Sequence, residues 1–411
     1  MRPASDRLSI LSLQYYSFPD EIGGAWKVSY ELNRRLVRRG HEVFLITCKP
    51  GHHLVDHETV DGIFYERIGV RASKSFLGLW RGIRKRVGSI FARSPVNLVH
   101  IHNPLVGFIA LLVFRLWSVP RIYHFHSCWY DEEKINRQGE SGLLFFLSLN
   151  LIRLMEWTCF LSAKKILFLS EYSRRRFLDY CPWRKTGLEV IPGGVDIDEF
   201  RPLNPEESLE QEREKLGLPG NKTLLLTVRR LESRMGLENL VQAVGMICQR
   251  SPEMDFILLI GGKGSLEGKL KSLVEQQNLQ DRVRLCGKIP QETLPTYYRV
   301  ADVFVLPTTF IEGFGLATVE ALASGVPVLG TPVGGTVEIL KSIDQKLLFR
   351  GIGPESLADG IEGFLRNLRD EPSLQVLKKN CRDTAVFRYE WEKVTDRIEH
   401  VFIQSAANRK R

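Results

Sequence analysis

Short apolar runs alternate with amphipathic stretches along the chain, and glycine, proline or polar residues bound each run. Runs of this length predict buried strands, and the amphipathic stretches between them predict helices. The first such helix covers residues 25–39 and ends at Gly40. Strands that alternate with helices imply parallel sheets, so we expect doubly wound α/β domains. The strands are predicted at residues 8–13, 42–47, 97–102, 121–126, 165–169, 223–228, 256–260, 284–286, 303–306 and 326–329.

The alternation occurs twice, and a polar stretch separates the two halves. Residues 204–220 carry runs of charge and several helix breakers, which is typical of a linker that enters a new domain. We therefore predict a first domain at residues 1–200, a linker at 201–220 and a second domain at 221–385. Both halves have glycine loops after strands, and two such Rossmann-like domains that face each other would leave a ligand-binding cleft.

The amino-acid composition indicates the class of protein and the compartment in which we expect it. The 411 residues are 44% hydrophobic and have a mean hydropathy of −0.12, as in soluble globular proteins. The seven cysteines are scattered and form no CxxC or Cys/His cluster, which favours a reducing compartment and argues against a metal site. The amino-terminal residues contain no apolar signal core, so we expect a cytoplasmic protein. Charged residues interrupt the apolar run at 143–169, which fits a buried core helix better than a membrane span.

Positive charge is concentrated in the first half of the chain. Residues 1–200 contain 28 Lys and Arg against 20 Asp and Glu, whereas residues 201–411 contain 29 against 28. The densest segment, residues 71–93, holds seven basic residues and no acidic one, and its apolar residues recur at helical spacing. This helix either lies on an anionic membrane surface or packs its apolar stripe in the core and leaves its basic face solvated; we favour core packing for the stripe.

The segment from Glu312 to Glu320 carries the strongest candidate chemistry. It follows the strand predicted at 303–306 and runs into a helical pattern. Two glycines let its backbone approach a ligand, and the helix N-terminus would bind phosphate readily. A phosphate cradle beside two carboxylates suits a ligand that is part phosphate and part polyol. The free backbone donors would be the amides of Phe314, Gly315 and Leu316.

Several further motifs occur in the order of one enzyme family. Each motif is weak alone, but their order is specific and they extend over nearly the whole chain. The chain is similar to the family-four glycosyltransferases of the GT-B fold, within the glycosyl transferases group 1 superfamily, whose signature is the Glu312–Glu320 spacing. The resemblance implies two Rossmann-like domains facing across a cleft, and a final helix at 386–411, with a basic tail, that crosses back to the first domain. The matching segments are residues 19–24, 39–43, 100–104, 123–126, 191–196, 261–264, 332–338 and 389–391.

The resemblance also assigns a donor site. Glu320 would bind the ribose hydroxyls of a nucleotide, and Glu312 would hold sugar hydroxyls beside the distal phosphate. His126 would lie beside the donor sugar, whereas His102 and His124 are expected to be core histidines. The other donor-binding residues that it implies are Gly23, Gly24, Gly262, Lys263, Ile289, Gly313, Phe314, Gly315 and Leu316.

One position departs from the family's pattern. The family pairs an Arg with a Lys to neutralise the donor diphosphate; Arg230 matches the Arg, but Met235 stands where the Lys belongs. A thioether cannot pair with phosphate. Arg234 is adjacent and long enough to reach, so we expect Arg230 and Arg234 to share the diphosphate. The alternative is a catalytically weak homologue.

The reaction that the resemblance implies is transfer of a sugar from a nucleotide-sugar, a UDP- or GDP-sugar above all, to an acceptor hydroxyl with retention at the anomeric carbon. Neither a cofactor nor a metal ion is expected, because arginines and helix N-termini would meet the charge of the leaving group. The basic first half favours a glycan, glycolipid or lipid-linked acceptor at the cytoplasmic face of a membrane.

Three other classes of protein compete with this interpretation. A nucleotide-sugar epimerase can share the architecture and would need no acceptor. A pyridoxal-phosphate phosphorylase also shares it, but no candidate Schiff-base lysine stands out. A nucleic-acid binder follows from the basic charge alone, yet no recognised module interleaves the basic residues with base-stacking aromatics, so we expect no nucleic-acid partner.

Overall fold

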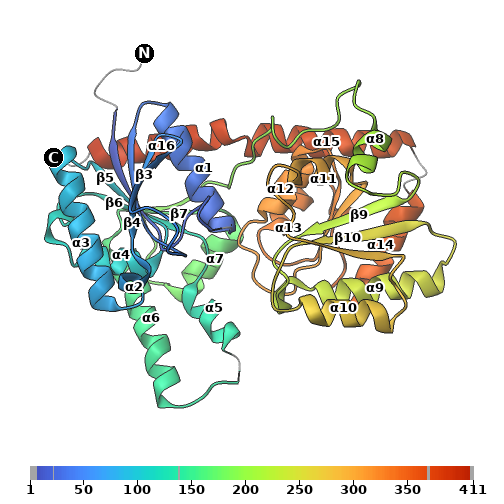
Figure 1. Cartoon of the computed structure of the whole chain (residues 1–411), viewed down its shortest axis with the longest axis horizontal. Coiled ribbons are helices and arrows are strands. Elements are labelled where there is room, and N and C mark those ends of the chain that lie inside the picture. The colour runs from blue at the N-terminus through green and yellow to red at the C-terminus, as the bar shows by residue number, and fades with distance from the viewer. Residues whose placement is uncertain (1–6, 22, 138, 368–370, 408–411) are drawn as a thin grey trace. The chain divides into compact units, whose positions relative to one another are not determined.

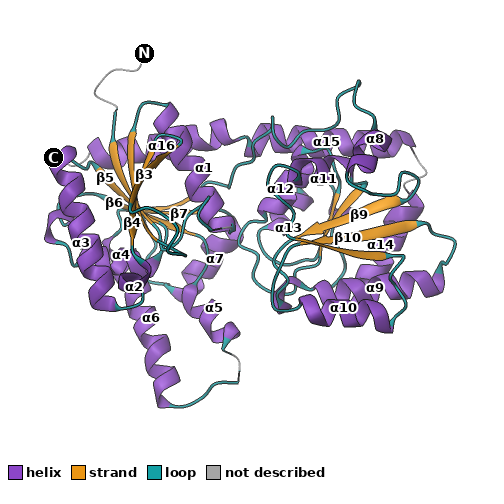
Figure 2. Cartoon of the chain, in the orientation of Figure 1, coloured by secondary structure: helices purple, strands orange, loops and turns teal. Residues whose placement is uncertain are grey.

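The computed structural model describes residues 7–21, 23–137, 139–367 and 371–407, and it divides the chain into two α/β units (Figures 1 and 2). Unit 1 contains the residues up to Pro192 together with those from Trp391 onward, and unit 2 runs from Gly193 to Glu390. Each unit has its own parallel sheet and its own core, so the predicted class of two Rossmann-like domains is confirmed.

The observed division differs from the predicted domain bounds. The segment predicted as a linker, residues 201–220, belongs to unit 2. Its helix α8 (Leu209–Lys215) buries Arg213, whose guanidinium donates to Val300 O at 2.9 Å and to Asp302 Oδ2 at 2.8 Å. A buried arginine that is bonded in this way ties the segment to the body of the unit, although its composition is polar.

Unit 1 is built on a sheet with the strand order β3-β4-β2-β1-β5-β6-β7-β8. Neighbouring strands are parallel except for the hairpin of β3 and β4. Its turn contains Asp61 and Gly62 at φ of 49° and 79°, so an Asp-Gly pair marks a hairpin that the pattern of apolar runs does not predict. The strands are β1 (Ser9–Leu13), β2 (Glu42–Cys48), β3 (His57–Val60), β4 (Ile63–Ile68), β5 (Leu98–Ile101), β6 (Arg121–Phe125), β7 (Lys165–Phe168) and β8 (Leu188–Val190).

Helix α3 resolves the two interpretations of the basic segment at 71–93. Its apolar stripe, including Leu79, Ile83 and Val87, is buried in the core of unit 1, so core packing of the stripe is confirmed. Arg86 is buried too and donates to Asp56 Oδ2 at 2.8 Å. The exposed basic residues of this helix include Arg81, Arg84 and Lys85. The helices of unit 1 are α1 (Gly24–Arg38), α2 (Val70–Ser73), α3 (Phe76–Arg93), α4 (Pro104–Leu111), α5 (Trp129–Asn136), α6 (Leu143–Ser162), α7 (Glu171–Tyr180) and α16 (Trp391–Ala407), with the 3-10 turn η2 (Phe114–Leu116).

Helix α6 is longer and more apolar than a typical surface helix. It is the one described helix that is long and apolar enough to cross a membrane by length and composition, but only 33% of its apolar stretch is buried. The expectation of a buried core helix therefore holds for one of its faces only.

The last helix, α16, packs on unit 1 as predicted. His41 Nε2 lies 2.7 Å from Glu399 Oε1, and Arg39 Nη1 donates to Glu399 Oε2 at 2.8 Å. Arg39 and His41 directly follow α1 and are distant in sequence from Glu399, so these bonds anchor the carboxyl-terminal helix.

Unit 2 has a five-stranded parallel sheet with the order β11-β10-β9-β12-β13. The order reverses between β9 and β12, and ligands of such sheets bind at the carboxyl ends of the strands at this switch point. The strands are β9 (Thr223–Val228), β10 (Phe256–Gly261), β11 (Val283–Gly287), β12 (Val303–Leu306) and β13 (Val328–Gly330). The helices are α8, α9 (Leu237–Arg250), α10 (Glu267–Gln276), α11 (Leu294–Val300), α12 (Leu316–Ala323), α13 (Thr336–Lys341), α14 (Pro354–Asn367) and α15 (Glu371–Tyr389), with the 3-10 turns η3 (Ser233–Met235) and η4 (Gln345–Leu347).

Candidate active site

The candidate site of unit 2 lies where β9 and β12 end. Arg229 directly follows β9, and the loop from Pro307 to Gly315 follows β12. Because β9 and β12 are hydrogen-bonded neighbours, both segments leave the sheet at its switch point. The predicted Glu312 loop is therefore at the edge of the sheet that suits a ligand.

Arg229 is the buried cation of this site. Its Nη2 donates to Glu312 Oε2 at 2.9 Å, and its Nη1 donates to Thr308 Oγ1 at 2.7 Å. The same Nη2 lies 3.0 Å from the sulfur of Met235. Burial lowers the pKa of Arg229, and the Glu312 carboxylate opposes that shift. The guanidinium thus fills the space beside Met235 and orients Glu312.

The two arginines expected to bind diphosphate have different surroundings. Arg230 is exposed, and its side chain makes no hydrogen bond within the described part of the chain. Arg234 Nη1 instead donates to Ile311 O at 2.9 Å, and Thr309 N donates to Arg234 O at 3.0 Å. Arg234 therefore braces the loop that carries Glu312, which leaves Arg230 as the cation open to a ligand.

The N-terminus of α12 forms a cradle lined by hydroxyl groups. Gly315 caps the helix at φ 97°, and a Cβ added there would lie 2.5 Å from Thr336 Oγ1 and 3.1 Å from Thr318 Oγ1. Both hydroxyls are buried and lack a partner among the described residues. A buried hydroxyl without a partner costs stability, so the pair indicates a missing acceptor such as a phosphate oxygen. Within residues 7–407 as described, the amides of Phe314, Gly315 and Leu316 also donate to no acceptor.

Glu320 lies inside α12 and is buried. The hydroxyl of Tyr298, on α11, donates to Glu320 Oε2 at 3.0 Å. Burial raises the pKa of Tyr298 well above its usual value, and the Glu320 charge adds to that shift. Tyr298 therefore remains a neutral donor that fixes this carboxylate.

The glycine loop after β10 packs against the segment that carries the arginines. A Cβ on Gly262, which has φ 139°, would lie 1.9 Å from Arg229 O, so only glycine fits there. Leu231 N donates to Lys263 O at 3.0 Å, while the Lys263 side chain is exposed. Ile289 is buried, and its Cδ1 lies 2.5 Å from a Cβ built on Gly261.

A column of histidines follows β5 and β6 in unit 1. His102 Nδ1 lies 3.0 Å from His126 Nε2, and His102 Nε2 lies 3.0 Å from His100 Nδ1. Burial lowers the pKa of His126 to about 4 and that of His100 to about 3. His126 ends the column at the carboxyl edge of the sheet and is half-buried, with no partner for Nδ1 among the described residues. It can therefore offer a neutral imidazole to a ligand.

The histidine column also has a geometry that sequence analysis did not foresee. Ring nitrogens of His100, His102 and His124 lie within 4.8 Å of one another, close enough for three ligands of one metal ion. His102 already uses both of its nitrogens in ring-to-ring hydrogen bonds, and His124 stacks on His126 with centroids 4.8 Å apart. The rings thus form a hydrogen-bonded, stacked column of neutral imidazoles.

The amino-terminal glycines stand at the start of α1. Gly23 is its N-cap, in an extended conformation, and Gly24 is its first residue. A Cβ on Gly23 would lie 2.7 Å from the Trp26 ring, which explains the need for glycine. Both stand at the end of the loop that leaves the carboxyl end of β1, the edge of the sheet at which His126 follows β6.

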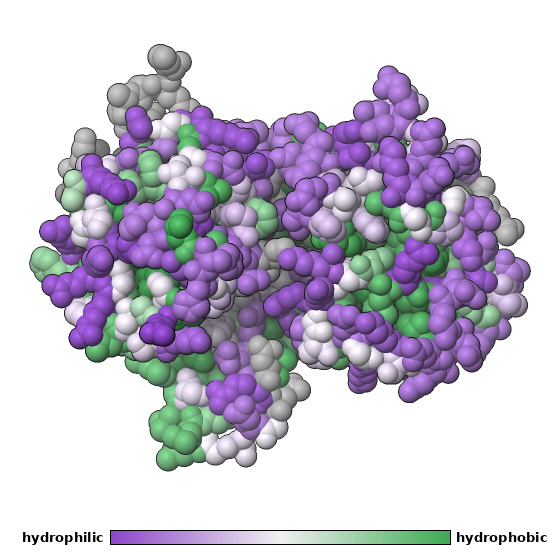
Figure 3. Space-filling model, in the orientation of Figure 1, coloured by the Kyte–Doolittle hydropathy of each residue, from purple (hydrophilic) through white to green (hydrophobic). Residues whose placement is uncertain are grey.

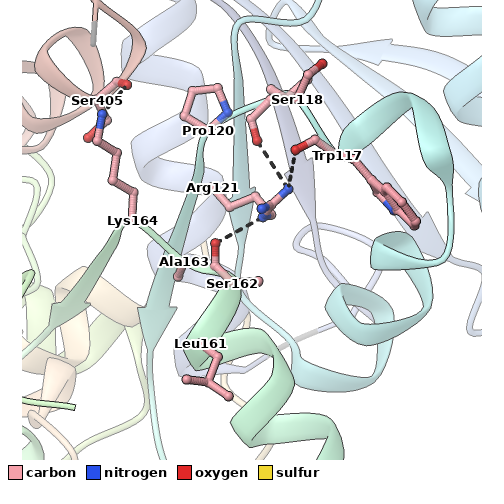
Figure 4. A pocket seen from close by; sticks show the side chains of 10 residues that line it. Trp117, Ser118, Pro120, Arg121, Leu161, Ser162, Ala163, Lys164 and Ser405 are labelled. Carbon is pink, nitrogen blue, oxygen red and sulfur yellow. Dashed lines mark hydrogen bonds between the residues drawn. The ribbon is translucent and has the colours of Figure 1, made fainter. Parts of the chain in front are cut away.

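A hollow of about 420 Å³ lies elsewhere in unit 1 (Figure 4). None of the predicted site residues lines it. Arg121, which begins β6 and so marks the edge opposite His126, donates to Ser162 O at 3.1 Å and to Trp117 O at 3.3 Å. The Arg121 guanidinium thus donates hydrogen bonds to backbone carbonyls. Leu161 and Lys164 border the hollow.

Two family models match the chain. Residues 208–384 match the model of Glycosyl transferases group 1, and residues 22–199 match Glycosyltransferase Family 4. An uncharacterized glycosyltransferase of Methanocaldococcus jannaschii is 25% identical over 399 residues, which are 95% of this chain and 97% of that protein. A D-inositol 3-phosphate glycosyltransferase of Corynebacterium urealyticum is 26% identical over 358 residues, 81% of each chain.

Solved structures show the same fold. A sucrose-phosphate synthase from Thermosynechococcus elongatus superimposes with a TM-score of 0.80 at 23% identity and covers 98% of this chain and 100% of its own. HepE of Anabaena, solved with UDP, has a TM-score of 0.74 at 18% identity and covers 96% of this chain and 99% of its own. At these identities the likeness concerns the fold alone.

Proposed function

Because the chain belongs to the group 1 and family 4 glycosyltransferases, we propose that it is a retaining transferase that moves a sugar from a nucleotide-sugar to an acceptor hydroxyl. The observation that carries the donor class is the cradle at Gly315. Two buried hydroxyls and three amides, none of them with a partner among the described residues, converge at one helix N-terminus three residues after Glu312. That arrangement matches a phosphate next to a polyol.

Different residues of the donor site bind different parts of the nucleotide-sugar. The amides of residues 314–316 and the hydroxyls of Thr318 and Thr336 bind phosphate oxygens. Glu312, held by Arg229, binds sugar hydroxyls, and Glu320, held by Tyr298, binds the ribose. Arg230 is the exposed cation for the diphosphate, and Arg234, although it braces the loop, keeps further N–H groups for the same ligand.

The transfer step follows from these groups without a bound cofactor or metal ion. As the bond between the anomeric carbon and the leaving phosphate breaks, negative charge develops on that phosphate, and the helix N-terminus and Arg230 stabilise it. The acceptor oxygen bonds to the anomeric carbon from the same face, and its proton passes to the leaving phosphate. His126 offers a neutral imidazole for the donor sugar.

The base and the acceptor are chosen by other parts of the chain. We place UDP first, ahead of GDP, and note that HepE was solved with UDP, UDP and glucose, and UDP-glucose. The exposed basic face of α3, with Arg81, Arg84 and Lys85, favours an acidic or lipid-linked acceptor and a peripheral place at an anionic membrane. All seven cysteines are free, in keeping with a cytoplasmic location.

A nucleotide screen followed by a transfer assay tests this function. UDP, GDP and ADP are compared for their effect on the melting temperature; a ligand at 100 times its Kd stabilises by about 2.7 kcal/mol. The preferred nucleotide's sugar is then supplied with and without a phospholipid or glycan extract. Product that forms only with the extract supports a transferase, whereas a new sugar isomer without acceptor would identify an epimerase. A chain that no nucleotide stabilises would contradict the proposal.

A further inference from the structure

An arginine in the interior of unit 1 forms an ion pair that no step of the proposed transfer uses. Polar and charged residues cover much of the surface of this unit (Figure 3), whereas the side chain of Arg67, in β4, is 1% exposed. Its Nε donates to Asp20 Oδ2 at 2.6 Å, and its Nη2 donates to Asp20 Oδ1 at 2.8 Å. The Asp20 side chain is 3% exposed. This two-point pairing fixes the direction of the carboxylate as well as its distance.

Asp20 belongs to the loop between β1 and α1. The described residues of this loop form neither helix nor strand. β4 holds the loop at a second point, because the Tyr65 hydroxyl donates to Phe18 O. Tyr65 and Arg67 are two residues apart in one strand, so both side chains leave the same face of β4. A strand that is distant in sequence therefore fixes the part of the loop that leads into α1.

The position of this loop in the sheet is that of a ligand-binding segment. β1 lies between β2 and β5, so the strand order reverses there, and ligands of such sheets bind at the carboxyl ends of the strands at the reversal. Gln14, which begins the loop, is 2% exposed, and its Oε1 has no partner among the described residues. A buried acceptor without a donor indicates a donor from outside the chain, such as a ligand hydroxyl. The loop ends at Gly23, the N-cap of α1, where backbone N–H groups begin the helix.

Arg67 itself is not available to a ligand. Its Nε and Nη2 are bonded to Asp20, and its Nη1 donates to Glu58 Oε2, in β3, at 2.8 Å. The guanidinium thus joins the loop to the β3–β4 hairpin. Because all three of its nitrogens are bonded and the side chain is buried, Arg67 can affect a ligand only through the loop.

We propose that Arg67 is a positioning residue for the transfer: through Asp20 it holds the loop that ends at Gly23 in the conformation that meets the nucleotide-sugar. This role rests on the proposed function. A loop without regular structure presents its groups in one geometry only if other elements tie it down, and a displacement of about 1 Å can cost about 10²-fold in rate. The β3–β4 hairpin, which carries Arg67 and Glu58, is thereby part of the support of the site.

Two variants separate positioning from stability. Asp20→Asn leaves the buried guanidinium without its charged partner, and we expect the melting temperature to fall and kcat/KM for the preferred nucleotide-sugar to fall by about 10- to 100-fold. Arg67→Met with Asp20→Leu removes both charges, so no buried charge is left unpaired and the melting temperature should recover. The kcat/KM of this double variant should stay low, because nothing then fixes the direction of the loop. Hydrogen exchange of the loop amides, measured without nucleotide, should be faster in both variants than in the wild type.

The matched control is Asp302→Asn. Asp302 Oδ2 pairs with Arg213 Nη2 at 2.8 Å, and the Arg213 side chain is 4% exposed, so this pair is also largely shielded from water. Asp302 precedes β12, however, and so lies at the edge of the unit 2 sheet opposite the candidate site. The control is expected to lower the melting temperature and to leave both kcat/KM and the exchange of the unit 1 loop unchanged.

The role of Arg67 is overturned if Asp20→Asn keeps the kcat/KM of the wild type or if the loop exchanges no faster. It is also overturned if the double variant recovers kcat/KM together with the melting temperature, because the pair would then be merely structural. A wild type that transfers no sugar would contradict the proposed function itself and, with it, any role in transfer. The two failures are therefore distinguishable.

Discussion

The guanidinium of Arg229 lies 2.9 Å from Glu312 Oε2 and 3.0 Å from the Met235 sulfur, so a buried cation stands beside the residue that replaces the family's lysine. Arg229, the residue after β9, thus places a positive charge next to Met235, where it pairs with Glu312. The side chain of Arg229 is 7% exposed and that of Glu312 is 19% exposed, so the pair is shielded from screening by salt.

Replacing Arg229 tests whether its guanidinium takes the place of the family's lysine. Arg229→Ala leaves Glu312 without its partner, and removing one side of a buried pair costs about 3–5 kcal/mol. We expect kcat/KM with the preferred nucleotide-sugar to fall by about 10²–10³. Initial rates and the melting temperature of the same preparations measure both effects.

The compensating variant separates charge from packing. Arg229→Ala with Met235→Lys places a lysine where the family has one without setting it against a guanidinium, and we expect it to regain most of the lost kcat/KM. Met235→Lys alone would place an ammonium against the Arg229 guanidinium and should destabilise unit 2. If the double variant is no better than Arg229→Ala, the cation at this place does not matter and Arg229 has a packing role only.

The two hydroxyls at Gly315 predict opposite effects on stability and on binding. Thr318→Val and Thr336→Val each remove a buried hydroxyl that has no described partner, so the free protein should gain about 1 kcal/mol of stability. If the hydroxyls bind phosphate, nucleotide affinity should fall by about 10- to 150-fold, since a hydrogen bond to a charged group contributes about 1.5–3 kcal/mol. Thermal melts and calorimetric titration with UDP give the two quantities.

Thr395 provides the matched control for this pair. Its hydroxyl is also buried without a described partner, but it lies on α16 in unit 1. Thr395→Val should stabilise the protein and leave UDP affinity unchanged. Unchanged affinity in Thr318→Val and Thr336→Val as well would remove the hydroxyls from the donor site.

The bond between Tyr298 and Glu320 predicts a smaller change. Tyr298→Phe removes the hydroxyl that donates to Glu320 Oε2 and keeps the ring in its buried place. We expect a loss of about 1.5–3 kcal/mol of stability, as for a hydrogen bond to a charged group, and a weaker hold on the ribose. The KM for the nucleotide-sugar should rise more than kcat falls; a selective loss of kcat would instead place Glu320 at the reacting centre.

The alternation of apolar runs and amphipathic stretches was sufficient to predict the α/β class and nearly all of the parallel strands. The β3–β4 hairpin was not predicted because its strands are exposed or mixed in polarity, although Asp61-Gly62 marks its turn. The predicted boundary of the second domain was wrong because Arg213 lies in a polar stretch that is typical of a linker. In the fold this arginine is buried and hydrogen-bonded within unit 2.

Only some residues of the candidate site could be predicted from the sequence. Glu312 and Glu320 could be chosen as candidates from the sequence, since both belong to one continuous segment whose glycines and spacing resemble the family's signature. The role of Arg229 could not be predicted, because its partners Thr308 and Glu312 are far from it in sequence and only the pairing of β9 with β12 brings them together. One signal was available: an arginine directly precedes Arg230, in a chain that lacks the expected lysine.

The histidine column predicts how unit 1 responds to acid. Burial lowers the pKa of His126 to about 4 and that of His100 to about 3, and it lowers those of His102 and His124 well below the usual range. Unfolded histidines have a pKa of about 6.5, so between that value and about 4 the unfolded state binds more protons. Stability that is present at neutral pH is therefore lost as the pH falls below about 6.5.

Each buried histidine should contribute a loss of about 1.4 kcal/mol per pH unit in that window. Glu156 works in the opposite sense, because burial raises its pKa to about 7 and the folded state takes up its proton first. One such carboxyl offsets about one histidine, so the net trend remains a loss on acidification. Melting temperatures from pH 7.5 to 5 test the trend, and Glu156→Gln should make it steeper. Imidazole nitrogen NMR at pH 5.5 should show the column still neutral; protonated rings at that pH would contradict the account, because a charged column could not stay packed beneath Phe402.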